Sequence, residues 1–112
     1  MGMQQKSKTL MHLSLCRKAG KLILGFDAVR EGVVAKRVFA VALAKDLSEK
    51  TRSNIIFAAD REGVPAAQLP DTLDELMPMV GKRAGVLGIA DQSLAGKLVQ
   101  LVQMAEHGGR CL

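Results

Sequence analysis

An unbroken apolar run at residues 38–44 constrains the fold of this 112-residue chain more than any other segment, and charged residues flank it on both sides. Such a run is too short to cross a bilayer as a helix, which needs about 20 residues. A short apolar run of this kind is typical of a strand that is buried on both faces. We therefore expect residues 38–44 to form a central strand between two layers of helices.

Helical patterns alternate with short apolar segments along the chain. Met11, Leu15 and Ala19, for example, recur every four residues, which is the spacing of one helix face. The predicted helices cover about residues 7–19, 27–35, 46–62, 71–80 and 94–108, and the predicted strands cover residues 22–24, 38–44, 64–69 and 86–90. This order predicts an α/β fold, a three-layer α/β/α sandwich around a small mixed sheet. We expect a single domain over residues 1–112, with its core at about 8–107.

Individual residues predict details of these elements. Pro65 lacks an N–H group, so the strand at residues 64–69 is expected at an edge of the sheet. Acidic residues favour the first turn of a helix, where they offset the positive end of its dipole. On this basis Asp71 with Asp74 should open the fourth helix, and Asp46 with Glu49, three residues apart as a variant of the capping box, should open the third.

Positive charge is concentrated in the first half of the chain. Residues 1–52 hold eleven of the sixteen Lys and Arg residues against four acidic residues, a balance of +7, whereas residues 53–112 have a balance of −2. A basic half is typical of a protein with an acidic partner such as a nucleic-acid backbone, although a merely solvated surface shows the same pattern. The scarcity of aromatic residues, three Phe with no Trp or Tyr, argues against an RNA reader that stacks bases on exposed rings.

No residue pattern indicates an enzyme. Neither Gly20-Lys21 nor Gly96-Lys97 has the upstream glycine and the following hydroxyl residue of a phosphate-binding loop. Cys16 fits a buried helix position, while His12 and His107 are expected on the surface, without a carboxylate partner at a suitable spacing. We expect neither catalysis nor a bound cofactor or metal.

The sequence also predicts the cellular location and the oligomeric state of the protein. The chain begins with a polar segment and has no apolar run of membrane-spanning length, so we expect a cytoplasmic protein with no membrane partner. The spacing of Cys16 and Cys111 suits neither a disulfide framework nor a zinc site. A monomer is expected.

A cluster of basic residues and glycines follows the first predicted helix. Arg17, Lys18 and Lys21 surround Gly20, and Gly25 stands just before the second helix. A helix N-terminus offers free N–H groups to phosphate, and a glycine there lets a nucleic acid approach the backbone closely. A helix C-cap and a loop on a basic surface would show the same residues.

The order of these motifs resembles the ribosomal protein L-seven-Ae family, in particular its bacterial YlxQ-like branch. The resemblance covers about residues 8–105, and the order of the motifs is distinctive while no single motif is. The shared motifs are LCRKAGKL at residues 15–22, the glycine at 25, VFAVALAKD at 38–46, GVP at 63–65, LDEL at 73–76, GKRA at 81–84 and VLGIAD at 86–91.

The resemblance implies a three-layer α/β/α fold and binding of kink-turn RNA in a ribosomal or other ribonucleoprotein setting. Members of the family bind this RNA through a segment of pattern G-x-N-E-x-x-K and through a loop before the last strand. Their Asn and Glu contact sheared G·A pairs, their Lys contacts the backbone, and a loop residue covers an extruded base. The RNA-binding residues expected here are Arg17, Lys18, Lys21, Gly25, Asp27, Lys82 and Arg83.

The sequence departs from the family pattern within the first of these segments. Gly25 is retained, but Asp27 stands in place of Asn, Ala28 in place of Glu and Glu31 in place of Lys. Asp27 accepts hydrogen bonds but cannot donate them as an amide does. Two interpretations stay open: an RNA-binding protein of altered specificity, or a protein-interaction adaptor on the same fold that has lost RNA binding. RNA binding is favoured if this segment and Lys82 lie together on a basic surface, and the adaptor is favoured if Asp27 and Glu31 dominate that surface.

Overall fold

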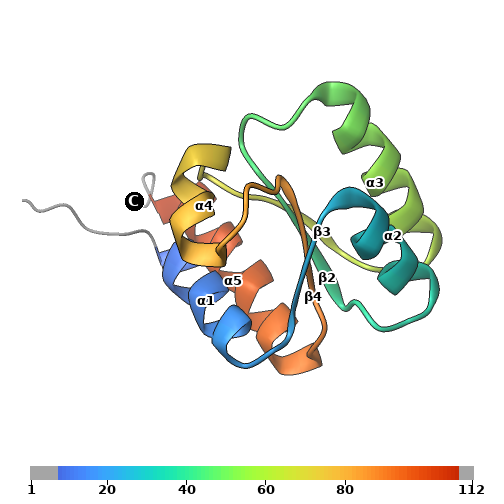
Figure 1. Ribbon diagram of the computed structural model, residues 1–112, viewed down its shortest axis with the longest axis horizontal. Coiled ribbons are helices and arrows are strands. Elements are labelled where there is room, and N and C mark those ends of the chain that lie inside the picture. The colour runs from blue at the N-terminus through green and yellow to red at the C-terminus, as the bar shows by residue number, and fades with distance from the viewer. Residues whose placement is uncertain (1–7, 109–112) are drawn as a thin grey trace, which may run out of the picture.

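The computed structural model describes residues 8–108. In that range helices and strands alternate (Figure 1), each within three residues of the bounds predicted above. The helices are α1 (Lys8–Lys18), α2 (Phe26–Val34), α3 (Glu49–Arg61), α4 (Leu73–Val80) and α5 (Gln92–Gly108). The strands are β1 (Leu22–Leu24), β2 (Ala40–Leu43), β3 (Ala66–Gln68) and β4 (Val86–Ile89).

The strands form one mixed sheet in the order β1-β4-β2-β3. β4 pairs antiparallel with both β1 and β2, and β3 pairs in parallel with β2. The central position predicted for the apolar run is confirmed, because β2 has a strand on each side and all four of its residues are buried. β3 lies at the edge, as expected, and Pro65 stands just outside it, where its carbonyl oxygen accepts the N–H of Val41 at 2.9 Å.

Helices cover both faces of this sheet, which confirms the three-layer α/β/α arrangement. In Figure 1, α1, α4 and α5 lie to the left of the sheet, and α2 and α3 lie to its right. Successive side chains of β2 point to opposite faces: Ala40 and Ala42 pack in the cluster with α1, α4 and α5, and Val41 and Leu43 pack with α2 and α3. Because both faces are covered, the strand reads as a continuous apolar run rather than an alternating one.

The buried face of α1 is not the stripe that the four-residue spacing picked out. Met11 and Leu15 are 58% and 52% exposed, and Ala19 is also exposed. The residues that α1 buries in the core recur every three positions and are Leu10, Leu13 and Cys16. Both stripes have helical spacing, so periodicity alone could not distinguish between them.

The predicted starts of the third and fourth helices are wrong in detail. α3 begins after Ser48, whose hydroxyl caps the helix, and α4 begins after Thr72, which forms a reciprocal capping box with Glu75. The Asp46 carboxylate accepts the backbone N–H of Leu73 at 2.9 Å, so it caps α4 rather than α3. Ser48 and Thr72 occupy the N-cap positions, and their hydroxyl oxygens accept the N–H groups of Thr51 and Glu75.

Three polar side chains, those of Thr9, His12 and Asp71, are buried in the described part of the chain. His12 was expected on the surface, but it is 7% exposed, and its Nε2 donates to the carbonyl oxygen of Leu94 at 2.8 Å. Asp71 is 4% exposed and accepts a hydrogen bond from the Thr9 hydroxyl at 2.6 Å. These bonds tie α1 to the start of α4 and to the first turn of α5.

None of the helices described combines the length and the apolar character of a membrane span.

Candidate functional site

One end of the sheet brings together two segments that the sequence singled out. Gly25 follows β1 directly, and its N–H donates to the carbonyl oxygen of Val86 at 2.9 Å. Because Val86 is the first residue of β4, this bond places the loop at residues 81–85 next to the start of α2. Both segments lie at the upper end of the sheet in Figure 1.

The backbone at Gly25 leaves the N-terminus of α2 open. Gly25 has φ +102°, which favours glycine, and nothing lies within 4 Å of the position that a Cβ would occupy. Gly25, the N-cap residue, provides no side-chain hydrogen bond to this helix, so the N–H groups of the first turn lack the usual capping partner. Asp27, in the first turn, is exposed and offsets the positive end of the helix dipole. The N-terminus can therefore receive an acceptor from a ligand, in competition with one carboxylate.

The neighbouring loop carries two exposed basic residues, Lys82 and Arg83. The guanidinium of Arg83 pairs with the Asp74 carboxylate on α4, whereas Lys82 belongs to none of the ion pairs among the described side chains. The last residue of the loop, Gly85, is tightly packed, because a Cβ added to it would lie 2.7 Å from the Leu47 side chain. The loop thus presents one unpaired cation and one cation held by a surface ion pair.

Arg17 reaches this loop from α1. Its Nη2 lies 2.7 Å from the position that a Cβ of Gly81 would occupy, so the guanidinium lies across the first residue of the loop. Gly81 is also the left-handed C-cap of α4, with φ +84°. Glycine at this position thus serves both the end of α4 and the placement of Arg17.

Lys21 is not part of this arrangement. It precedes β1, whereas Gly25 follows β1, and at about 3.3 Å per strand residue the two Cα atoms lie about 13 Å apart. The carbonyl oxygen of Lys21 accepts the N–H of Ala90, which marks the opposite end of β4. Lys18 is exposed at the last position of α1. The structure therefore places Gly25 and Asp27 beside the end of the loop that carries Lys82 and Arg83, places Arg17 at the first residue of that loop, and places Lys21 at the opposite end of β1.

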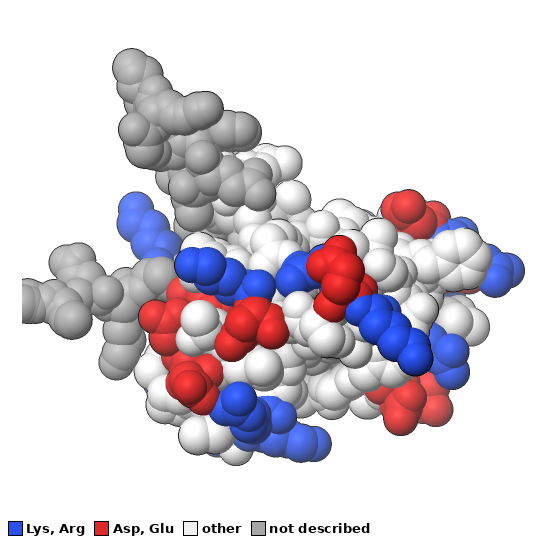
Figure 2. Space-filling view, turned by 90° about the horizontal axis from the view of Figure 1, so that it is seen from above, with Lys and Arg blue, Asp and Glu red and all other residues white. Residues whose placement is uncertain are grey.

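The surface at this end carries mixed charge. Figure 2 views the molecule from above and shows Lys and Arg side chains strung across the face with Asp and Glu side chains between them. Part of the positive charge is engaged within the protein: Arg52 donates to the carbonyl oxygen of Leu47 at 3.1 Å and pairs with Glu49 at 3.7 Å. Glu31 lies farther along α2, in a groove between α2 and α3. The segment at Gly25 lies beside the end of the loop that carries Lys82, but the surface around the two segments is not uniformly basic.

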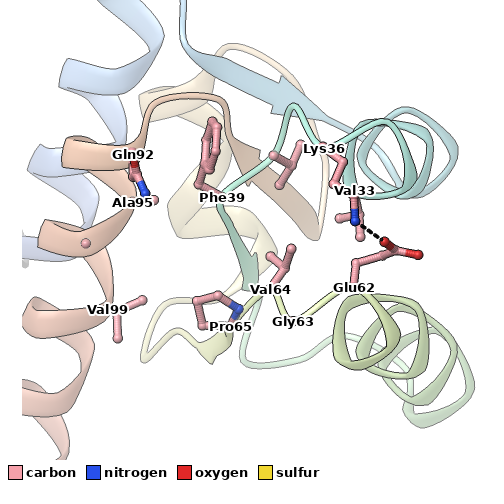
Figure 3. Close-up of a pocket in the computed structure, with 12 residues that line it drawn as sticks. Val33, Lys36, Phe39, Glu62, Gly63, Val64, Pro65, Gln92, Ala95 and Val99 are labelled. Atoms are coloured by element: carbon pink, nitrogen blue, oxygen red, sulfur yellow. Dashed lines mark hydrogen bonds and ion pairs between the residues drawn. The ribbon is translucent and has the colours of Figure 1, made fainter.

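The opposite end of the sheet has a hollow of about 380 Å³, shown in Figure 3. Its walls are mainly apolar, with Val33, Val64 and Val99 among them. At one side the Lys36 ammonium pairs with the Glu62 carboxylate at 2.8 Å, and this hydrogen bond lowers the pKa of Glu62. An apolar hollow whose one ion pair is already satisfied offers no group poised for proton transfer or nucleophilic attack.

Cysteine and metal chemistry find no support in the described part of the chain. Cys16 is buried, and burial, reinforced by the Asp91 charge, raises the pKa of its thiol to about 11, which opposes thiolate formation. Among the described residues, no three His, Cys, Asp or Glu side chains are placed to hold a metal ion. Cys111 and the side chain of His107 lie outside the described part.

Two stacked pairs of side chains were missed by the sequence analysis. The guanidinium of Arg30 lies over the ring of Phe26, and that of Arg61 lies over the ring of Phe57. In each pair the arginine follows the phenylalanine by four residues, and that spacing on a helix was the signal in the sequence. Both pairs border the groove between α2 and α3.

Comparisons with known proteins bear on the whole chain. No model of a known protein family matches it. A protein of Enterococcus faecium described as the RNA-binding protein YlxQ is 30% identical over 102 residues, which cover 91% of this chain and 96% of that protein. The structure of a Bacillus halodurans protein of unknown function is similar with a TM-score of 0.82 at 24% identity, covering 87% of this chain and 98% of that one. The 15.5 kD RNA-binding protein of Giardia lamblia has a TM-score of 0.68 at 17% identity, covering 95% and 92%. The two structures share the fold.

Proposed function

Since this chain belongs to the ribosomal protein L-seven-Ae family, in its YlxQ-like branch, we propose that it binds structured RNA at the end of the sheet that carries Gly25. The observation that carries this proposal is the hydrogen bond from Gly25 to Val86, because it joins an open helix N-terminus to a loop with two exposed cations. The Enterococcus faecium relative, described as an RNA-binding protein, matches over nearly its whole length and supports the same function.

The two segments divide the work of binding. The N–H groups at the start of α2 donate to RNA acceptors, and Lys82 neutralises a phosphate of the adjacent strand. Arg83 can exchange the Asp74 carboxylate for a phosphate at little cost, because exposed ion pairs are worth only about 0–1 kcal/mol. Arg17 lies against Gly81, the first residue of the loop, and adds a third cation to the loop. Sequence-independent affinity thus comes mainly from the loop.

The RNA is a relative of the kink-turn, read with altered specificity, in ribosomal RNA or another ribonucleoprotein. Asp27 can accept hydrogen bonds from base amino groups, but it cannot donate to base acceptors as Asn does. Ala28 offers no polar group to a base edge, so one contact of the family pattern is lost. The protein acts as a cytoplasmic monomer and as a binding module rather than as an enzyme.

A titration with a kink-turn hairpin and a plain duplex of equal length tests this function. We expect the hairpin to bind more tightly than the duplex. Replacing Lys82→Ala and Arg83→Ala together should weaken both complexes and reduce the slope of log affinity against log salt by up to about 1.8, or 0.9 per phosphate contact.

The matched control is the pair Arg37→Ala and Lys97→Ala, which removes the same charge from exposed positions toward the other end of the molecule. If this control pair weakens binding as much as the loop pair, the effect is one of net charge and the loop is not the contact. If the wild-type protein binds neither RNA even at low salt, the adaptor interpretation replaces RNA binding.

A further inference from the structure

The groove between α2 and α3 carries chemistry that the proposed site does not use. It has a volume of about 810 Å³, and two of the three phenylalanines of the chain, Phe26 and Phe57, line it. Phe57 is 65% exposed, the most exposed of the large apolar side chains in the described part. Val34, which is 60% exposed, lines the same groove, so the exposed apolar surface there is more than a single ring and favours a contact surface.

Each ring in this groove is paired with an arginine. The guanidinium carbon of Arg30 lies 5.8 Å from the ring centre of Phe26, and that of Arg61 lies 5.8 Å from the ring centre of Phe57. Each pair lies on a single helix, so the geometry needs no partner to form. A ring next to a guanidinium is the combination on which unpaired bases stack while a neighbouring phosphate is neutralised.

The groove begins at the proposed RNA site. Phe26 follows Gly25 directly in the sequence. β1 and β2 both run antiparallel to β4, so α2 and α3 leave the same end of the sheet and run side by side (Figure 1). The ion pair between Lys36 and Glu62 joins their far ends. From Phe26 to Ala35 the groove follows about 13 Å of helix, which is enough for a short run of nucleotides.

The charges along the groove favour an anionic occupant. Among the described side chains, neither Arg30 nor Arg61 belongs to an ion pair. Two acidic side chains line the groove. Glu62 forms an ion pair with Lys36, whereas Glu31 belongs to none of the ion pairs among the described side chains. A nucleic acid offers phosphates to the two arginines and flat bases to the two phenyl rings. An acidic peptide offers carboxylates to the arginines alone.

We propose that this groove binds a single-stranded RNA segment that continues from the structured RNA at Gly25. Its bases stack on Phe57 and Phe26, and Arg30 and Arg61 neutralise its phosphates. The proposal rests on the RNA-binding function proposed above and adds unpaired flanking nucleotides to the recognised target. The few aromatic residues of the chain, which argued against base stacking from composition, are thus concentrated where stacking is possible.

The test compares a blunt kink-turn hairpin with the same hairpin carrying about six unpaired nucleotides at its 5′ or 3′ end. We expect the extension on one end to tighten wild-type binding by about five- to a hundredfold, the range of one stacked base. Phe57→Ala should remove most of that gain, because Phe57 is the more exposed of the two rings, and leave affinity for the blunt hairpin unchanged. Arg61→Gln should flatten the salt dependence of the extended hairpin alone, by about 0.7 in log–log slope.

A matched control and a direct readout are available within the chain. Phe39→Ala removes the third phenylalanine, which is 38% exposed at the opposite end of the sheet, and should leave the gain from the extension intact. Since the chain has no Trp or Tyr, Phe57→Trp introduces a single indole fluorophore and keeps an aromatic face. The extended hairpin should quench its fluorescence, and the blunt hairpin should not.

The possible outcomes separate this proposal from the function beneath it. Equal binding of blunt and extended hairpins by the wild-type protein overturns the groove proposal, leaves structured-RNA binding in place and leaves the groove to a protein partner. If neither hairpin binds, RNA binding itself is wrong and the groove proposal fails with it. An equal loss for both hairpins in the Phe57→Ala protein, with its circular dichroism unchanged, also overturns the groove proposal, because the ring would then serve the structured part of the RNA.

Discussion

Asp27, Ala28 and Glu31 occupy exposed positions of α2, whose packing depends on Val29 and Val33 on the other side of the helix. Substitutions at exposed positions of this kind usually change the free energy of unfolding by less than about 0.5 kcal/mol. These three residues can therefore be exchanged for the Asn, Glu and Lys of the family pattern without disturbing the fold. Their effect on RNA binding can then be read separately from any effect on stability.

Restoring the family pattern with Asp27→Asn, Ala28→Glu and Glu31→Lys should raise affinity for a kink-turn over a plain duplex. The first two changes should each add about 1–3 kcal/mol of discrimination where the new side chain hydrogen-bonds a base edge. Glu31→Lys alone serves as the control, because an added cation should strengthen binding to both RNAs and steepen the salt dependence. Titrations at two salt concentrations measure both effects. A triple variant with no higher affinity for the kink-turn would show that the docking differs, and would favour the adaptor interpretation.

At the scale of elements, the ends of the helices determine what the loops present. Gly81 and Gly63 both follow helices with positive φ, +84° and +72°. They differ in surroundings, because a Cβ on Gly81 would meet the Arg17 guanidinium, whereas a Cβ on Gly63 would meet nothing within 4 Å. Replacing either glycine by a residue with a Cβ would introduce the same backbone strain, but only the replacement at Gly81 bears on the candidate RNA site.

Gly81→Ala and Gly63→Ala should each lower the free energy of unfolding by about 1–2 kcal/mol, the cost of a left-handed residue with a Cβ. Gly81→Ala should in addition weaken RNA binding, because the new methyl group displaces Arg17 from the base of the loop. Urea denaturation and hairpin titration of both variants measure the two effects. If the two variants bind RNA with equal affinity, Arg17 does not contact the RNA.

The sequence was informative about elements and weaker about their ends and faces. The run at residues 38–44 predicted β2 correctly, because a strand that is covered on both faces is apolar at every position. The buried face of α1 was missed because two stripes, one with a spacing of three residues and one with a spacing of four, both fit a helix, and the stripe with Met11 and Leu15 is the exposed one. Asp71 was assigned to a helix start because its partner, the Thr9 hydroxyl, lies 62 residues away in the chain. Contacts of that range have no local signature.

At the scale of the whole molecule, the two halves of the chain interleave around one sheet. β4 comes from the half with a charge balance of −2, yet it lies between β1 and β2 from the half with a balance of +7. Charge counted along the sequence therefore indicated the sign of a partner but not the face it binds. The juxtaposition of Gly25 with the loop at residues 81–85 could not be predicted from local patterns, because it depends on the antiparallel pairing of β1 with β4.

Cys16 can report on the opening of the folded structure around α1. Its side chain is fully buried where α1 packs against the sheet, and the pKa of its thiol is raised from 9.0 to about 11. Because the raised value belongs to the folded state, burial of the neutral thiol favours folding below pH 9, and this contribution is lost as pH rises toward 11. Near neutral pH the folded protein holds an unreactive thiol, so alkylation requires the structure to open.

In a Cys111→Ser variant at about pH 8, alkylation of Cys16 should be at least about a thousandfold slower than in concentrated urea, since small domains unfold with 5 kcal/mol or more. RNA that binds the folded state alone should slow it further, by about a hundredfold when the free kink-turn hairpin exceeds its Kd a hundredfold. Mass spectrometry of the labelled chain measures both rates. Fast labelling without RNA would mean that α1 detaches from the sheet independently. If a saturating hairpin leaves the labelling rate unchanged, the RNA binds equally well when α1 is detached from the sheet. Because Arg17 lies on α1, that result would show that Arg17 does not contact the RNA.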